Sequence, residues 1–185
     1  MEAAETKKHV GEASSVGDIV SSRSFLSFSP DQYVKLILPA MQRAGAGCAG
    51  VVDHDDRLIG MLTEREILRR IFAMLADPVI RQDNIGKNID DMTVRDVMIR
   101  YPITLEEDMD IEDALALMTK LGFRFMPVVS SRDSRKLIGL LDERELAIHV
   151  QNRLAHVKKE AAEKEAMIFS LFHEPYGVGY CLHTI

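Results

Sequence analysis

Two four-residue segments combine oxygen-bearing and cationic side chains at the same spacing. They are Thr63-Glu64-Arg65-Glu66 and Asp142-Glu143-Arg144-Glu145. Each follows an apolar run typical of a buried strand, and its first residue is of a type that favours a helix N-cap. The start of a helix presents unpaired backbone N–H groups and the positive end of the helix dipole. Both segments are therefore candidate sites for an anionic ligand.

The first residue distinguishes the two segments. The Thr63 hydroxyl could donate a hydrogen bond to a phosphate or cap the helix, whereas the Asp142 carboxylate could cap the helix but would repel a phosphate. We expect the Thr63 segment to hold the better phosphate site, and the Asp142 segment to be empty or to take a less anionic ligand. Arg65 and Arg144 fit two roles: clamping a phosphate or carboxylate, or pairing with glutamates on the helix surface.

The elements that carry these segments form an internal repeat. The ten residues 57–66 match residues 136–145, and the stretch 16–20 matches 94–98. Between them lies one amphipathic helix pattern in each copy, with apolar residues at i, i+3, i+4 and i+7. These positions are Val34, Ile37, Leu38 and Met41 in the first copy, and Ile111, Ala114, Leu115 and Met118 in the second. The offset stays between 77 and 79 residues, so the second half of the chain repeats the first.

The repeated pattern resembles a tandem pair of cystathionine β-synthase (CBS) domains. The resemblance is carried by Val-x-Asp-hydrophobic, then hydrophobic-Val-Val, then Leu-Ile-Gly followed by two hydrophobic residues and the polar helix start, and it covers roughly residues 14–155. It implies two small three-stranded sheets with flanking helices, related by a pseudo-two-fold axis. It also implies that adenosine-containing ligands sit in the cleft between the copies. The family pattern has a Ser or Thr early in the last helix, where it meets phosphate or ribose, and an Asp three residues later that holds the ribose hydroxyls.

The resemblance supplies the candidate ligand-binding residues. They are Asp18, Gly60, Thr63, Arg65, Glu66, Asp96, Pro127, Val128, Gly139, Asp142, Arg144 and Glu145. Both ribose positions are glutamate where the family has aspartate. A carboxylate suits ribose because its two oxygens accept charge-assisted hydrogen bonds from two neighbouring hydroxyls. The longer side chain could bind ribose with adjustment, form a salt bridge with a nearby arginine, or fill the pocket.

The predicted fold class is α+β, with a long C-terminal helix added to the two repeats. The expected segments are a flexible lead-in at 1–13, the first repeat at 14–76, a linker at 77–92, the second repeat at 93–155, and a helical extension with an apolar tail at 156–185.

Composition excludes several classes of function. The 185 residues carry a net charge of −6, which argues against nucleic acid or an anionic membrane as the main partner. The two cysteines, Cys48 and Cys181, have no paired spacing, and Asp53-His54-Asp55-Asp56 is interpreted as a turn, so we predict no metal site. With no leader-like start and no apolar run of about 18 residues, the expected location is the cytoplasm.

The C-terminal helix is predicted to run from 142 to about 172. Mostly apolar residues recur along it at alternating spacings of four and three residues, which is the pattern of a coiled-coil seam. The seam comprises Val150, Leu154, Val157, Ala161, Lys164, Ile168 and Leu171. We expect this extension to pair with another subunit in a homodimer, with packing on its own repeat as the alternative.

The sequence favours a non-catalytic regulatory module that binds an adenine nucleotide of the AMP, ADP or ATP class and signals by a conformational change. The alternative is a structural or dimerising adaptor with degenerate nucleotide sites, which binds a protein partner through its C-terminal helix and tail. No nucleophile stands with a base at a recognisable spacing and no phosphate loop is present, so we do not expect an enzyme.

Overall fold

A computed structural model of the chain describes residues 13–21, 23–76 and 89–172. The first half contains α1 (Val16–Val20), β1 (Ser27–Phe28), α2 (Val34–Ala44), β2 (Cys48–Val52), β3 (Leu58–Thr63) and α3 (Glu64–Ala76). The second half contains a short 3-10 helix (Ile89–Asp91), α5 (Val94–Val97), β4 (Ile99–Arg100), β5 (Leu105–Glu106), α6 (Ile111–Leu121), β6 (Phe125–Val129), β7 (Leu137–Asp142) and α7 (Glu143–Phe172). Most of the expected lead-in (1–12), most of the linker (77–88) and the C-terminal tail (173–185) lie outside the described residues.

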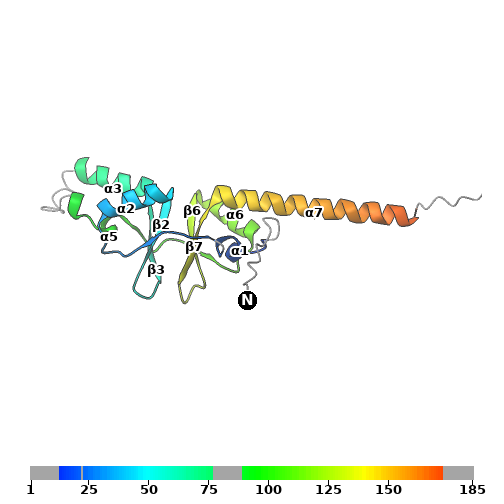
Figure 1. Cartoon of the computed structure of the whole chain (residues 1–185), viewed down its shortest axis with the longest axis horizontal. Coiled ribbons are helices and arrows are strands. Elements are labelled where there is room, and N and C mark those ends of the chain that lie inside the picture. The colour runs from blue at the N-terminus through cyan, green and yellow to red at the C-terminus, as the bar shows by residue number, and fades with distance from the viewer. Residues whose placement is uncertain (1–12, 22, 77–88, 173–185) are drawn as a thin grey trace, which may run out of the picture.

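Two small sheets form the centre of the molecule, one from each half (Figure 1). In each sheet a short first strand runs parallel to the second, and the second pairs antiparallel with the third. The first sheet has one strand more than expected, because β4 from the second repeat pairs with β3 through Gly60↔Arg100 and Met61↔Ile99. The mixed helices and sheets, repeated twice and followed by a long helix, confirm the α+β class.

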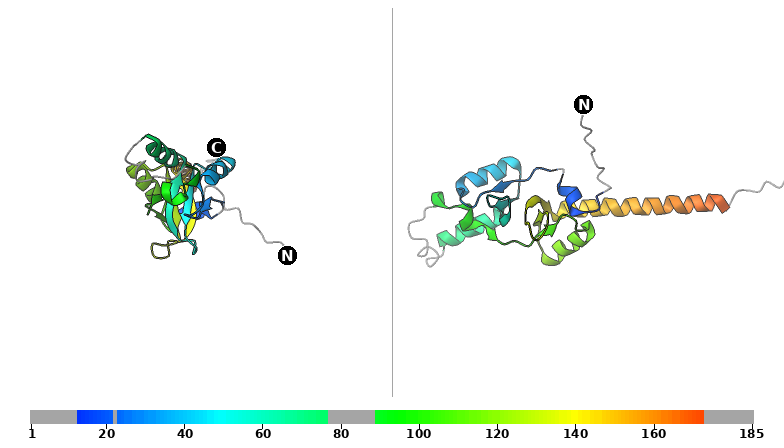
Figure 2. Two further views of the ribbon diagram at one scale, coloured as in Figure 1. Left: turned by 90° about the vertical axis from the view of Figure 1, so that its left-hand side faces the viewer. Right: turned by 90° about the horizontal axis from the view of Figure 1, so that it is seen from below.

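Each half completes its core with a short helix from the other repeat. Val16, Ile19 and Val20 of α1 are buried in the core of the second half, while Val94 and Val97 of α5 are buried in the core of the first. Figures 1 and 2 show α1, in dark blue, beside α6 and the start of α7. This exchange interlocks the two repeats.

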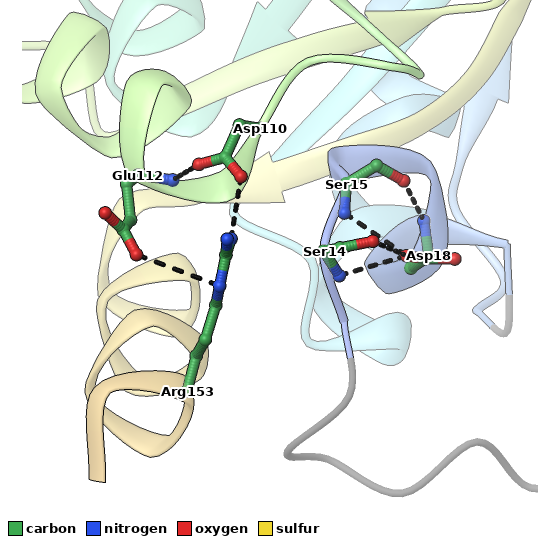
Figure 3. Close-up of polar contacts among 6 residues, drawn as sticks. All are labelled: Ser14, Ser15, Asp18, Asp110, Glu112 and Arg153. Carbon is green, nitrogen blue, oxygen red and sulfur yellow. Dashed lines mark hydrogen bonds and ion pairs between the residues drawn. The ribbon is translucent and has the colours of Figure 1, made fainter. Parts of the chain in front are cut away.

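The backbone anchors of the two exchanged helices correspond to each other. The Val16 N–H donates to the Met109 carbonyl at 2.9 Å, and its equivalent Val94 donates to Gln32 at 2.8 Å. Both helices start with a capping box, in which the carboxylate of an aspartate at the third position accepts a hydrogen bond from the N-cap backbone N–H. Asp18 forms this box with Ser15 (Figure 3).

The pseudo-two-fold axis passes through an antiparallel contact between equivalent loops. Arg57 pairs with its own counterpart Lys136. The Leu58 N–H donates to the Arg135 carbonyl at 2.8 Å, and the Leu137 N–H donates to the Asp56 carbonyl at 3.1 Å. Leu58 and Leu137 also pack together with Val129 in a small core between the halves. The predicted pseudo-two-fold arrangement is therefore present.

Helix α7 has a buried start and an exposed remainder. Leu146 and Val150 pack in the core of the second half. Arg153 holds the helix to the start of α6, because its Nη1 atom donates to Asp110 Oδ2 at 2.7 Å (Figure 3). Every residue from 154 to 170 is exposed, and α7 extends well past the body of the protein (Figures 1 and 2). Among the described residues, no helix combines the length and apolar character needed to cross a membrane.

We predict that an added methyl group at Gly139 destabilises the protein more than the same change at the equivalent Gly60. A Cβ atom at Gly139 would lie 2.4 Å from the branched Val20 Cβ atom of α1, whereas at Gly60 the nearest atom is the Met98 sulfur at 2.6 Å, which ends a flexible side chain. Overpacking of this kind costs about 1–3 kcal/mol. Urea unfolding of Gly139→Ala and Gly60→Ala measures the difference, and equal midpoints would contradict it.

Stability should depend on pH through Asp110. Its hydrogen bonds from the Arg153 side chain and the Glu112 backbone lower the pKa of the Asp110 carboxyl. A carboxyl with a lowered folded pKa stabilises the protein above its unfolded pKa, and this contribution is lost as the pH falls from about 5 towards 3. Asp110→Asn should flatten this part of the stability curve, measured as urea midpoints against pH. Arg153→Gln should flatten the same part, and a profile parallel to that of the wild type in either variant would argue against the assignment.

Candidate functional site

A cavity of about 360 Å³ lies where the two repeats meet at the start of α7. That volume is in the range of sites for small organic ligands. The first repeat lines it with Val20, Arg23, Ser24, Phe25, Leu26, Ala44, Gly45, Ala46, Gly47 and Cys48, and the second with Arg124, Phe125, Gly139, Leu140, Asp142 and Glu145. Both repeats line the cavity because α1 packs in the core of the second half. This packing places the segment that follows α1 beside the second sheet.

Asp142 caps α7 at the edge of this cavity. Its Oδ1 atom accepts a hydrogen bond from the Arg144 N–H at 2.9 Å, as an N-cap does. Its Oδ2 atom is held by Arg124, whose Nη2 and Nε atoms lie 3.2 and 3.3 Å away. The Arg124 guanidinium also lies 4.6 Å from the centre of the Phe125 ring. The negative charge of Asp142 is thus balanced by Arg124, whose guanidinium group also contacts an aromatic ring.

Glu145 forms an ion pair with Arg23, which belongs to the other repeat. Arg23 lies on the segment after α1, and Glu145 lies in the first turn of α7. The Glu145 side chain is 28% exposed and that of Arg23 is 48% exposed, so both can be reached from solvent. This pair bridges the two repeats across the cavity.

The remaining walls of the cavity are largely apolar. Val20 is buried, Leu26, Leu140 and Phe125 are half-buried, and Phe25 is 36% exposed. Gly47 lets the Phe125 ring approach the backbone, since a Cβ atom there would lie 2.9 Å from the ring. The cavity therefore joins two aromatic rings to two ion pairs, a combination that suits a flat heterocycle with a polar extension.

The sequence model of one family, described as the CBS domain, matches residues 16–73 and 94–152. The chain belongs to the CBS-domain family. Protein MK0525 of Methanopyrus kandleri is 31% identical over 150 residues, which make up 81% of this chain and 69% of that protein. Inosine-5′-monophosphate dehydrogenase of Methanocaldococcus jannaschii is 28% identical over 144 residues, 77% of this chain and a quarter (25%) of the enzyme.

Two solved structures have the same CBS-pair fold. CBSX2 in complex with AMP gives a TM-score of 0.61 at 24% identity, covering 75% of this chain and 97% of that one. The CBS domain pair of protein MJ0100 in complex with 5′-methylthioadenosine and S-adenosyl-L-methionine gives 0.56 at 19% identity, again covering 75% and 97%. At these identities the likeness shows the fold.

The CBS motif of the first repeat has a different environment. The Thr63 hydroxyl accepts a hydrogen bond from the Glu66 N–H at 3.2 Å and so caps α3. Both Glu66 carboxylate oxygens bind arginines of the same helix: Arg69 at 2.6 and 2.9 Å and Arg70 at 3.2 Å. The Arg69 hydrogen bond is the largest cause of the lowered pKa of Glu66. Of the alternatives open from the sequence, Glu66 adopts the salt bridge with neighbouring arginines.

Three of the twelve sequence-predicted residues line the cavity: Gly139, Asp142 and Glu145. Asp18 and Asp96 serve their capping boxes, Pro127 and Val128 are buried in β6, and Arg65 and Arg144 are exposed. Gly60, Thr63 and Glu66 belong to the other copy of the motif. The preference for Thr63 as the phosphate site stays a prediction, and the cavity described above lies at the Asp142 copy.

The residues predicted from the sequence do not include four that line the cavity: Arg23, Phe25, Arg124 and Phe125. Arg124 and Phe125 stand directly before the Met-Pro-Val-Val run of β6, so their position at a strand entrance was the available signal. Arg23 and Phe25 gave no such signal, because only the exchange of α1 brings them to the second repeat.

The acidic loop between β2 and β3 folds as the expected turn. Asp53 Oδ1 accepts hydrogen bonds from the Asp55 and Arg57 N–H groups, both at 2.9 Å. Ligand atoms of Asp53, His54 and Asp55 lie within 4.8 Å of one another, all near the surface. The backbone bonds account for the position of the Asp53 carboxylate, as in a turn rich in aspartate.

We predict that Cys48, on the cavity wall, resists alkylation. Burial, reinforced by the charge of Asp142 and opposed by Arg124, raises the pKa of the Cys48 thiol to about 12. At pH 8 this lowers the thiolate fraction on the order of 10³-fold relative to an ordinary cysteine. Iodoacetamide labelling of a Cys181→Ser variant, followed by mass spectrometry, measures the rate. Asp142→Asn should speed the reaction, and labelling of Cys48 at the rate of a free thiol would disprove the assignment.

Proposed function

We propose that this CBS pair is a cytoplasmic, non-catalytic regulatory module that binds an adenosine-containing ligand and signals by a conformational change. The observation that carries the proposal is the cavity at the start of α7, which both repeats line. The AMP complex of CBSX2 and the 5′-methylthioadenosine and S-adenosyl-L-methionine complex of MJ0100 support an adenosine ligand for this fold. We take the ligand class to be AMP, ADP or ATP.

The lining residues match the parts of an adenosine nucleotide. Phe25 and Phe125, with aliphatic neighbours, offer apolar surface for the purine. Glu145 offers two acceptor oxygens for the ribose hydroxyls. Arg23 and Arg124 offer guanidinium groups for a phosphate. Because both arginines already bind carboxylates, the ligand has to exchange places with an existing ion pair.

Replacement of an ion pair by the ligand could change how the two repeats contact each other. The Arg23–Glu145 pair joins the two repeats, so a ribose that takes Glu145 frees Arg23 for a phosphate. A ligand shifts a conformational equilibrium only when it binds the two states with different affinity. A state in which the ion pair is open binds ribose better than one in which it is closed, which meets this requirement.

We predict that AMP or a related adenosine ligand raises the melting temperature, and that Glu145→Ala weakens binding at least about tenfold by removing charge-assisted hydrogen bonds. Glu66→Ala is the matched control, because Glu66 holds the equivalent position in the other repeat but binds Arg69 and Arg70. Asp142→Thr, which installs the residue of the first repeat, should strengthen binding of phosphorylated ligands.

The measurements are thermal shift and isothermal titration with AMP, ADP, ATP, NAD and S-adenosylmethionine. If none of these ligands shifts the melting temperature or releases heat, the proposed function fails. Equal losses in Glu145→Ala and Glu66→Ala would place the ligand elsewhere.

The second candidate function is a dimerising or adaptor role. It is favoured by the exposed part of α7, which leaves Leu154, Val157, Met167, Ile168 and Phe169 between 45 and 65% exposed. A helix surface this apolar is more typical of a protein contact than of a surface in water. The tail at 173–185, which the sequence also assigned to a partner, lies outside the described residues. We propose a homodimer as the assembly, and self-association is the measurable consequence.

A further inference from the structure

The apolar face of α7 continues from the body of the protein into solvent, and Lys164 is the one charged residue among its seam positions between 150 and 168. Leu146 and Val150 on this face are buried against the second repeat. One and two turns further along, Leu154 is 45% exposed and Val157 is 55% exposed, and Ile168 on the same face is 55% exposed. The exposed stretch 154–170 spans about 25 Å at about 1.5 Å per residue. The face that packs the helix onto its own core thus has no cover beyond Arg153 among the described residues.

We propose that residues 154–170 of α7 pair with the same segment of a second copy in an antiparallel two-helix coiled coil. The inference goes beyond the proposed ligand function and uses none of the cavity residues. It commits to a second copy because the segment is self-complementary in charge, with three lysines and three glutamates. Lys159 and Glu163 form an ion pair at 3.9 Å on the face opposite the apolar stripe. That charged face is therefore suited to remain in contact with water.

A parallel, in-register pair is disfavoured by the charges beside the stripe. In a parallel coiled coil the residue before one core position lies near the residue five places later in the partner helix. This rule brings Glu160 next to Glu165 of the second copy, twice by symmetry. It also sets Lys164 opposite Lys164 in the seam itself. All of these contacts join like charges.

The antiparallel arrangement turns the same residues into favourable contacts. When Val157 lies opposite Ile168 of the second copy, Ala161 lies opposite Lys164. The small Ala161 leaves room for the Lys164 stem, whose ammonium group can extend to solvent. In this register Lys158 lies beside Glu165 of the second copy, and two-fold symmetry makes the contact twice. Opposite charges at these flanking positions set the orientation of coiled-coil helices.

The test uses charge reversal in the full-length chain, followed by sedimentation velocity over a range of concentrations. The wild type should be a dimer at micromolar concentrations, and Ile168→Asp should be a monomer. Lys158→Glu and Glu165→Lys should each weaken self-association by about tenfold, because each places two like-charge pairs in the dimer. An equimolar mixture of the two variants should restore dimerisation, because the heterodimer contains only opposite-charge pairs.

Lys159→Glu is the matched control, with the same change of charge on the solvent face, and it should leave the dimer unchanged. Circular dichroism of each variant verifies that α7 and the CBS pair stay folded. A monomeric wild type, or an Ile168→Asp variant that still dimerises, would overturn the proposal. Tighter association of Lys158→Glu would also overturn it, because the parallel arrangement places residue 158 near Arg153 of the second copy. A mixture that forms no heterodimer would do the same. Ligand titration of Ile168→Asp keeps this outcome separate from the proposed function, because the substitution lies outside the cavity.

Discussion

The exchange of short helices between the repeats is the constraint on which the rest of the structure depends. A repeat of about sixty residues has little apolar surface to bury by itself, and small domains are marginally stable for that reason. Here Val16, Ile19 and Val20 complete the second core, and Val94 and Val97 complete the first. Neither half retains its full core when the other is removed. The same exchange brings the segment after each short helix to the opposite sheet, and so creates a seam that both repeats line.

The duplication gives each repeat an equivalent strand-to-helix junction, one with Glu66 and one with Glu145. The two junctions differ in the strands and side chains around them. In the first sheet the exchanged segment forms β4 and pairs with Gly60 and Met61 of β3, whereas the three-stranded second sheet has no counterpart to β4 among the described residues. Glu66 is bound by arginines from its own helix, but Glu145 is bound by Arg23 from the other repeat. An intrahelical pair leaves the seam unaffected when it opens. The Arg23–Glu145 pair joins the two repeats, so its opening removes a contact between them.

Sequence patterns predicted the features that are local or repeated. The strand-to-helix junctions at 63 and 142, the paired helix patterns, and the single helix of α7 all follow from periodicity and capping chemistry within one segment. The exchange could not be predicted this way. Helices of four and five residues, such as α5 and α1, are too short for periodicity to indicate which core they join. The contacts of Arg23 follow from the exchange, and for this reason the cavity was located only in part.

The charge balance of the cavity restricts the kind of regulation that it can support. Its two carboxylates and two guanidinium groups form two ion pairs with one another. A ligand that brings only negative charge would have to break a pair and leave Glu145 or Asp142 without its cation, which is costly where the group is partly buried. A ligand with both hydroxyl donors and an anionic group replaces each broken contact, with its hydroxyls on Glu145 and its anion on Arg23. If the proposed function holds, the preformed ion pairs favour ribose-containing anions over simple anions, without a dedicated phosphate loop.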